Sequence, residues 1–143
     1  MQEHIERLNR HIERGTLIRG KWTGRDASGR DTACLLAAMV PQCGEDESAR
    51  SCPADVMPSW LAQMTPSLDD NGSLDAWPVM VKRYAGLAAR WHALDAAAWQ
   101  RVQFGWLAAV VREAASHTNE PAVTAICERV AMLCDGVVAT GVI

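Results

Sequence analysis

Apolar residues recur at helical spacing along most of the chain, and the pattern is strongest between Asp95 and Ser116. At about 100° per residue, this segment places most of its large apolar side chains in one broad sector, with a narrow polar strip beside it. The members of that sector are Trp99, Val102, Phe104, Trp106, Leu107, Val110 and Val111. A surface helix buries a narrower sector. We therefore expect a central helix at 95–116, with Asp95 as its N-cap, packed on more than one side.

The same spacing predicts five further helices. They lie at about 2–14, 32–40, 53–66 or 58–66, 78–92 and 121–134. Gly15 is expected to end the first, Pro41 the second and Pro66 the third, because Gly favours a helix C-terminus and Pro interrupts one. In the last helix a coiled-coil-like seam runs through Val123, Ile126, Cys127, Val130, Leu133 and Cys134. Short connections favour antiparallel neighbours.

Residues 16–31 are the least helical part of the chain, because three glycines and a Ser28-Gly29 turn signal interrupt them. A small β-hairpin near 16–23 is compatible with this composition. The expected fold class is therefore all-α: an irregular bundle of five or six helices around 95–116, with one short hairpin. We expect residues 1–143 to form a single helical domain.

Composition restricts the class of protein further. A chain of 143 residues with 49% apolar and 22% charged residues is typical of one globular domain. No stretch of 18 uncharged apolar residues is present, so no membrane span is expected. The first 14 residues are charged throughout and do not resemble a secretory signal. A cytoplasmic location is the resulting expectation.

Charge is unevenly distributed, although the net value is only −3. Residues 1–30 hold seven Lys or Arg and four acids, whereas residues 31–75 hold one Arg and eight acids. Positive charge interleaved with an aromatic side chain can bind an acidic protein surface or a phosphate backbone. Such a candidate surface consists of Arg19, Lys21, Trp22, Arg25 and Arg30, with Arg101 and Arg112 as a second basic strip on the central helix.

A structural role for the same basic segment is the alternative. Trp22 would then pack inward, and the cations would be solvated or would pair with the acidic residues 45–47 of the same molecule. The negative overall charge favours this alternative over a dedicated nucleic-acid interface, since such proteins are usually basic.

Motifs for catalysis, metal binding and cofactor binding are missing from the sequence. It lacks a nucleophile elbow, a phosphate-binding loop and a paired metal-ligand motif. Cys34, Cys43 and Cys52 recur every nine residues, which is not a zinc-ligand spacing. Cys43 and Cys52 are nevertheless the candidates for a reactive thiol pair. We expect neither a metal ion nor a cofactor.

Taken together, these features favour a small non-enzymatic protein-binding module with an interaction or regulatory role. A nucleic-acid-associated regulator that uses residues 19–30 is one alternative, and a thiol-redox protein or enzyme is another. The abundance of Ala and the excess of Arg over Lys are typical of small bacterial or phage proteins. By analogy of size and character alone, this profile includes phage-encoded inhibitors. The expected partner is a protein.

Overall fold

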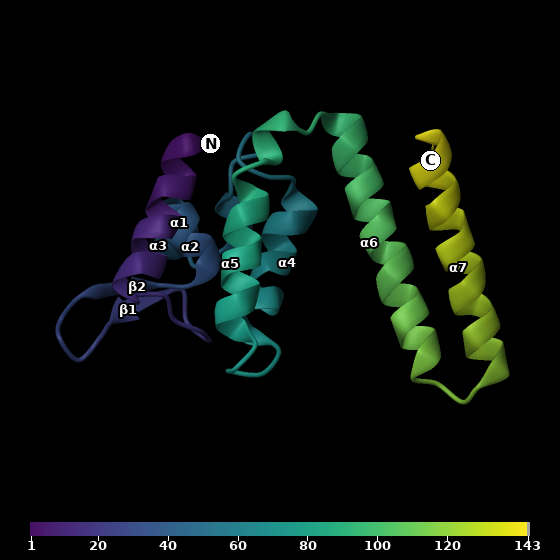
Figure 1. Cartoon of the computed structure of the whole chain (residues 1–143), viewed down its shortest axis with the longest axis horizontal. Coiled ribbons are helices and arrows are strands. Elements are labelled where there is room, and N and C mark those ends of the chain that lie inside the picture. Colours follow the sequence, from purple (N-terminus) through teal and green to yellow (C-terminus); the bar gives the residue numbers. More distant parts are fainter. Residues whose placement is uncertain (143) are drawn as a thin grey trace. The chain divides into compact units, whose positions relative to one another are not determined.

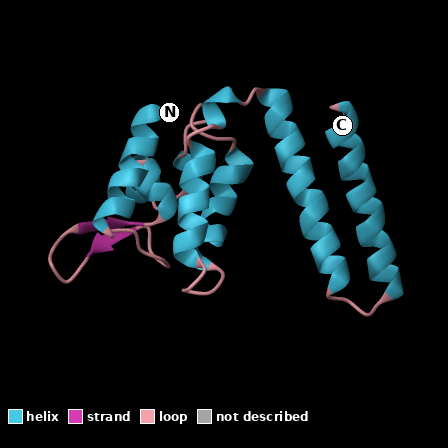
Figure 2. Cartoon of the chain, viewed as in Figure 1, coloured by secondary structure: helices cyan, strands magenta, loops and turns pink. Residues whose placement is uncertain are grey.

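A computed structural model describes residues 1–142 and is mainly helical, with one short two-stranded sheet (Figures 1 and 2). The all-α class with a short hairpin is thus confirmed. The chain divides into two compact units, of which the first covers Met1–His92 and the second begins at Ala93. Because each unit is described by itself, the prediction of one domain over 1–143 stays a prediction.

The first unit contains five α-helices, two strands and two short 3-10 segments within the described residues. In chain order they are α1 (Gln2–Arg14), β1 (Thr23–Arg25), β2 (Asp31–Ala33), α2 (Leu35–Met39), α3 (Pro41–Glu45), η1 (Ala49–Ser51), α4 (Ser59–Asp70), α5 (Trp77–Ala88) and η2 (Trp91–Ala93). Helix α1 has the predicted bounds. It ends at Gly15, whose φ of 62° is the left-handed conformation that glycine adopts most easily.

The β-hairpin lies later in the chain than predicted, at 23–33 instead of 16–23. Strands β1 and β2 are antiparallel, with Thr23 opposite Ala33. Their turn is closed by the Asp26 carboxylate, which accepts hydrogen bonds from the Ser28 side chain and from the backbone N–H groups of Ser28 and Arg30. These donors, the Ser28 hydroxyl first among them, lower the pKa of Asp26 well below its usual value. The turn at Ser28-Gly29 is therefore stabilised by the carboxylate of Asp26, which precedes that turn signal.

The predicted helix at 32–40 is shorter than expected, since its first residues belong to β2. Cys34 is the N-cap of α2, and the helix ends before Val40. The expectation that this segment is buried is confirmed, because every residue from Thr32 to Val40 is buried. Pro41 does end α2, but it also occupies the first position of α3, a position that suits proline.

Helix α4 continues through Pro66 to Asp70, so the prediction that Pro66 ends the helix was wrong. Tertiary contacts hold the turn beyond the proline. The Arg19 guanidinium donates to the carbonyl oxygens of Asp69, at 2.7 Å, and Asp70, at 2.6 Å, at the C-terminal end of α4. The Asp69 carboxylate accepts from Leu35 N, at 2.8 Å, and from Trp77 Nε1, at 2.7 Å. Asp69 is only 1% exposed and joins α4 to α2 and α5.

The second unit is a hairpin of two long antiparallel helices, α6 (Ala96–Ser116) and α7 (Pro121–Thr140). Helix α6 begins and ends as predicted, and the Asp95 side chain caps it by accepting from Ala98 N. The expectation that the last helix ends at Asp135-Gly136 was wrong, because α7 continues to Thr140 and is capped by Gly141, whose φ is 73°. The expectation that α6 packs on more than one side stays a prediction, because each unit is described by itself. Within the described residues, α7 packs along one face of α6 and Ala108 is the buried residue of that helix.

Candidate functional site

Small side chains form the contact between α6 and α7. The buried residues at this contact are Ala108 on α6 and Ala131 and Cys134 on α7, with Phe104 and Leu107 packed against them. Alanine lets two helices approach closely, but it buries little apolar surface. Most of the large aliphatic side chains of α7 are therefore left outside the contact that joins the hairpin.

A regular apolar row occupies a second face of α7. Its members are Val123, Ile126, Val130, Leu133 and Val137, which follow the three- and four-residue steps of a heptad. Val occupies the a positions, and Ile126 and Leu133 occupy the d positions, as in associating helices. Ile126 is 61% exposed and Leu133 is 73% exposed. The predicted coiled-coil-like seam therefore divides between two faces of α7. Cys134 is buried against α6, whereas Val123, Ile126, Val130 and Leu133 are exposed.

Helix α6 adds its own apolar residues on the same side of the hairpin. An ion pair between Arg112 and Asp135 joins the two helices on the opposite side. Leu107 lies five residues before Arg112, and Val130 five before Asp135, so each is turned about 140° away from the ion pair. We call the resulting surface the apolar hairpin face and define it as Leu107, Val110, Val123, Ile126, Val130 and Leu133.

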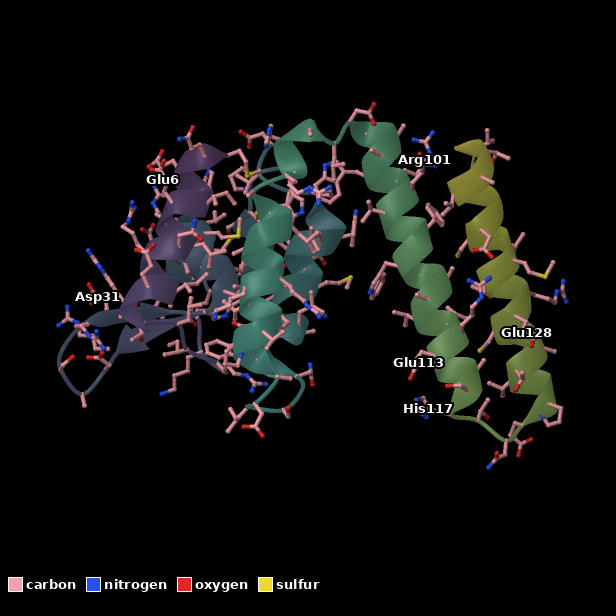
Figure 3. The ribbon with its side chains drawn as sticks, viewed as in Figure 1. Glu6, Asp31, Arg101, Glu113, His117 and Glu128 are labelled. Carbon is pink, nitrogen blue, oxygen red and sulfur yellow. The ribbon has the colours of Figure 1, made fainter. Side chains whose placement is uncertain are left out.

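The cross-helix ion pair lies away from that face, whereas Arg129 of α7 borders it, three residues after Ile126 and four before Leu133. Arg112 and Asp135 pair on its other side, where the Arg112 guanidinium lowers the pKa of the Asp135 carboxyl. Figure 3 shows Arg101 near the start of α6, and Glu113 and His117 near its end, where they pair at 2.9 Å. These two ion pairs therefore do not oppose the approach of another neutral surface to the apolar hairpin face.

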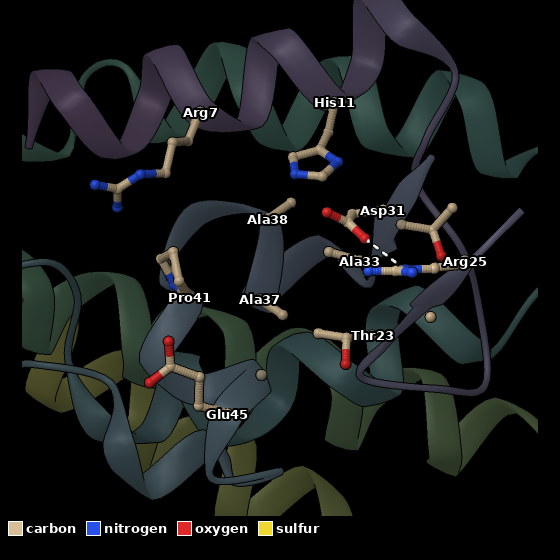
Figure 4. A pocket seen from close by; sticks show the side chains of 13 residues that line it. Arg7, His11, Thr23, Arg25, Asp31, Ala33, Ala37, Ala38, Pro41 and Glu45 are labelled. Atoms are coloured by element: carbon tan, nitrogen blue, oxygen red, sulfur yellow. Dashed lines mark hydrogen bonds and ion pairs between the residues drawn. The ribbon is translucent and has the colours of Figure 1, made fainter. Parts of the chain in front are cut away.

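A cleft lies in the first unit between α1 and the β1–β2 hairpin. It consists of two adjoining lobes with volumes of about 560 and 700 Å³, which share Arg7, His11 and Asp31. The smaller lobe has walls of small apolar residues, and Arg7 and His11 extend from α1 toward it (Figure 4). Gly44 lets α3 close one side, since a Cβ there would lie 2.7 Å from Thr23 Cγ2.

The second lobe of the cleft is strongly basic. Its lining includes Arg7, Arg10, Arg14 and Arg30, with Asp31 as its carboxylate. Burial lowers the pKa of His11, which also lines this lobe, and Arg14 and Arg10 lower it further. The imidazole is therefore uncharged at neutral pH, and the arginines carry the positive charge.

The binding residues predicted from the sequence fall in four different places. Arg25 and Arg30 line the cleft and form ion pairs with Asp31, at 3.1 Å, and Asp26, at 2.8 Å. Arg19 holds the end of α4, as described above. Lys21 and Trp22 line a small pocket beside Cys34 and Asp69. Arg101 and Arg112 belong to the second unit. The role of all seven residues in partner binding stays a prediction.

The proposed internal pairing of the basic segment with residues 45–47 is not observed. Among residues 1–142, the ion pairs of Arg25 and Arg30 are made with acids of their own hairpin. Glu45 lines the smaller lobe across from Arg7 without forming an ion pair. The cleft residues that sequence reasoning missed are Arg7, Arg10, His11 and Arg14. Their spacing on one face of α1 was the available signal.

Cys43 and Cys52 lie close together, as expected of a candidate thiol pair, and all five cysteines are free. Cys43 is fully buried, and burial, reinforced by the neighbouring Cys52, raises its pKa to about 12. Burial also raises the pKa of Cys52. Because the thiolate is the reactive form, this environment disfavours the predicted alternative of a redox-active pair.

Neither metal-site geometry nor a membrane-spanning helix is found in the described part of the chain. Within residues 1–142, no three His, Cys, Asp or Glu side chains are placed to hold a metal ion, and no helix is long and apolar enough to cross a membrane. Comparison of the chain with models of known families, with curated proteins and with solved structures found no match.

Proposed function

We propose that this protein is an interaction module that associates with a second copy of itself through the apolar hairpin face. The observation that carries the proposal is the exposed heptad row on α7, flanked by apolar residues of α6. The sequence predicts a protein-binding role, and this row supports a specific surface for it. That surface differs from the arginine- and tryptophan-bearing one expected from the sequence. A regulatory or inhibitory role and a cytoplasmic location stay predictions from the sequence.

The size of the apolar hairpin face is sufficient for a specific dimer with a small interface. A helix of 20 residues is about 30 Å long, and two packed helices present a face about 18–20 Å wide. Pairing of two such faces buries about 1,100–1,200 Å² in total, which exceeds the roughly 1,000 Å² expected of a biological interface. The result would be a four-helix arrangement, in which the rows of large aliphatic residues meet at the centre.

Self-association fits the chemistry of this face better than binding to a charged partner. The six residues that define the apolar hairpin face are aliphatic, so two copies can pair them in a symmetric interface without burying a charge. A strongly acidic or basic partner would find no opposite charge on it. In addition, the heptad spacing of the α7 row is the pattern by which helices associate.

The experiment that tests the proposal is sedimentation equilibrium of the intact chain in reducing buffer. We expect a mass of about 31 kDa, twice the 15.6 kDa of one chain. Because the interface is apolar, the mass should not fall when salt is raised, unlike that of an assembly held by ion pairs. A monomer at every concentration up to about 100 µM, a range in which weak specific dimers still form, would overturn the proposal.

A further inference from the structure

We propose that the cleft between α1 and the β1–β2 hairpin binds the phosphate groups of a small organic polyphosphate. This inference is independent of self-association, because the cleft lies wholly in the first unit. The basic lobe would hold the phosphates, and the lobe with small apolar walls would hold the attached organic group.

The arrangement of arginines in the basic lobe carries the inference. Arg7, Arg10 and Arg14 occupy one face of α1, and the β-hairpin brings Arg30 beside them. Arg30 Nη1 donates to the carbonyl oxygen of Arg14, at 3.0 Å, which fixes its guanidinium at the end of α1. Four guanidinium groups from two elements far apart in sequence thus line a single lobe.

Two of these arginines have no acidic partner. Arg7 pairs with Glu3, and Arg30 pairs with Asp26. Within residues 1–142, Arg10 and Arg14 form no ion pair. Like charges four residues apart on a helix destabilise it, so the repulsion between Arg10 and Arg14 lowers the stability of α1. A bound anion would remove this repulsion. Arginine presents planar, paired N–H donors that match phosphate oxygens.

The shape and lining of the cleft favour a small molecule over a nucleic acid. Its lobes, at about 560 and 700 Å³, have the size of ordinary small-molecule sites. The smaller lobe is walled by Ala33, Ala37, Ala38 and Pro41 (Figure 4). Neither lobe is lined by Trp, Tyr or Phe, the side chains on which the bases of single strands stack. The net charge of −3 also opposes binding to a long polyanion.

Glu45 makes the two lobes of the cleft electrostatically different. Its carboxylate lies in the apolar-walled lobe and would repel phosphate there. The basic lobe contains Asp31 as its carboxylate, and that group pairs with Arg25. A ligand with charge at one end and a compact neutral group at the other therefore fits the cleft in one orientation.

Isothermal titration of the intact protein with inorganic triphosphate tests the phosphate half of this inference. At about 50 mM salt we expect micromolar affinity that weakens as salt is raised, since arginine–phosphate contacts are screened. The double variant Arg10→Gln/Arg14→Gln should lose at least about tenfold in affinity. Lys82→Gln/Arg90→Gln removes two exposed positive charges of α5 and the residues just after it, and should change the affinity less than about twofold.

Three results would overturn the inference. The first is no binding of triphosphate up to millimolar concentration. The second is an equal loss of affinity in the Lys82→Gln/Arg90→Gln control, which would show binding to net charge alone. The third is tighter binding of a short single-stranded oligonucleotide than of adenosine triphosphate, which would identify a nucleic-acid surface instead. Circular dichroism of both double variants checks that the helices remain intact.

Discussion

Leu133→Glu is expected to convert the dimer into a monomer while leaving the helical hairpin intact. Leu133 is 73% exposed within one chain, so a carboxylate there remains solvated in the monomer. In the proposed dimer the same carboxylate would be buried against aliphatic side chains, which costs several kcal/mol. Sedimentation equilibrium should show at least about a 100-fold weaker association.

Met132→Glu is the matched control for that substitution. Met132 is the neighbouring residue and is 69% exposed, but it lies on the side of α7 that carries the ion pair of Asp135. It should therefore leave the dimer mass unchanged. Equal dissociation by both variants would show that any added charge on α7 disrupts the assembly, and it would contradict the assigned face.

Asp69→Ala is expected to lower the free energy of unfolding of the first unit by about 2–4 kcal/mol. The substitution leaves the N–H groups of Leu35 and Trp77 without their buried acceptor. It also removes a carboxyl whose pKa is raised by burial, and the relief of that cost offsets part of the loss. Urea denaturation followed by tryptophan fluorescence measures the difference.

Asp75→Ala provides the comparison for Asp69→Ala. Asp75 is exposed, so its replacement should change the unfolding free energy by less than about 0.5 kcal/mol. Asp69→Asn should fall between the two, because the amide retains one oxygen to accept a hydrogen bond and loses the other. If Asp69→Ala were as stable as Asp75→Ala, the three helices would not depend on this carboxylate.

Local signals in the sequence identified several helix ends correctly. Gly15, Asp95 and Pro121 mark the ends of α1, α6 and α7, because each acts on its own helix through capping or proline geometry. The end of α4 was not predictable in this way. Pro66 is a local stop signal, yet the contacts that hold the end of α4 include Arg19, 50 residues before Asp69, and Leu35, 34 residues before it.

The sequence predicts which residues of the two long helices are apolar, but not which face of each helix meets the other. Periodicity shows that the apolar sector of 95–116 is too wide for one neighbour, and it shows the heptad steps of α7. It does not show which of two adjacent rows meets the other helix. In the structure the two helices meet along the rows that contain Ala108 and Ala131, since small residues allow close approach. Ile126 and Leu133 lie outside this contact.

The basic cleft was only half predictable for a similar reason. Arg25 and Arg30 stood out because an aromatic residue and glycines surround them, whereas the arginines of α1 look like the solvated side of an amphipathic helix. The return of the chain at 16–33 brings the two groups together. Such proximity depends on tertiary structure, which residue spacing alone does not specify.

Side-chain footprinting above and below the dissociation concentration tests the central claim most directly, because it reports which surface becomes covered. Photochemical labelling of Ile126 and Leu133 should fall several-fold as the dimer forms, whereas labelling of Met132 should stay constant. Unchanged labelling of Ile126 and Leu133 in a confirmed dimer, or protection of Met132 instead, would contradict the claim that the apolar hairpin face joins two copies of this protein.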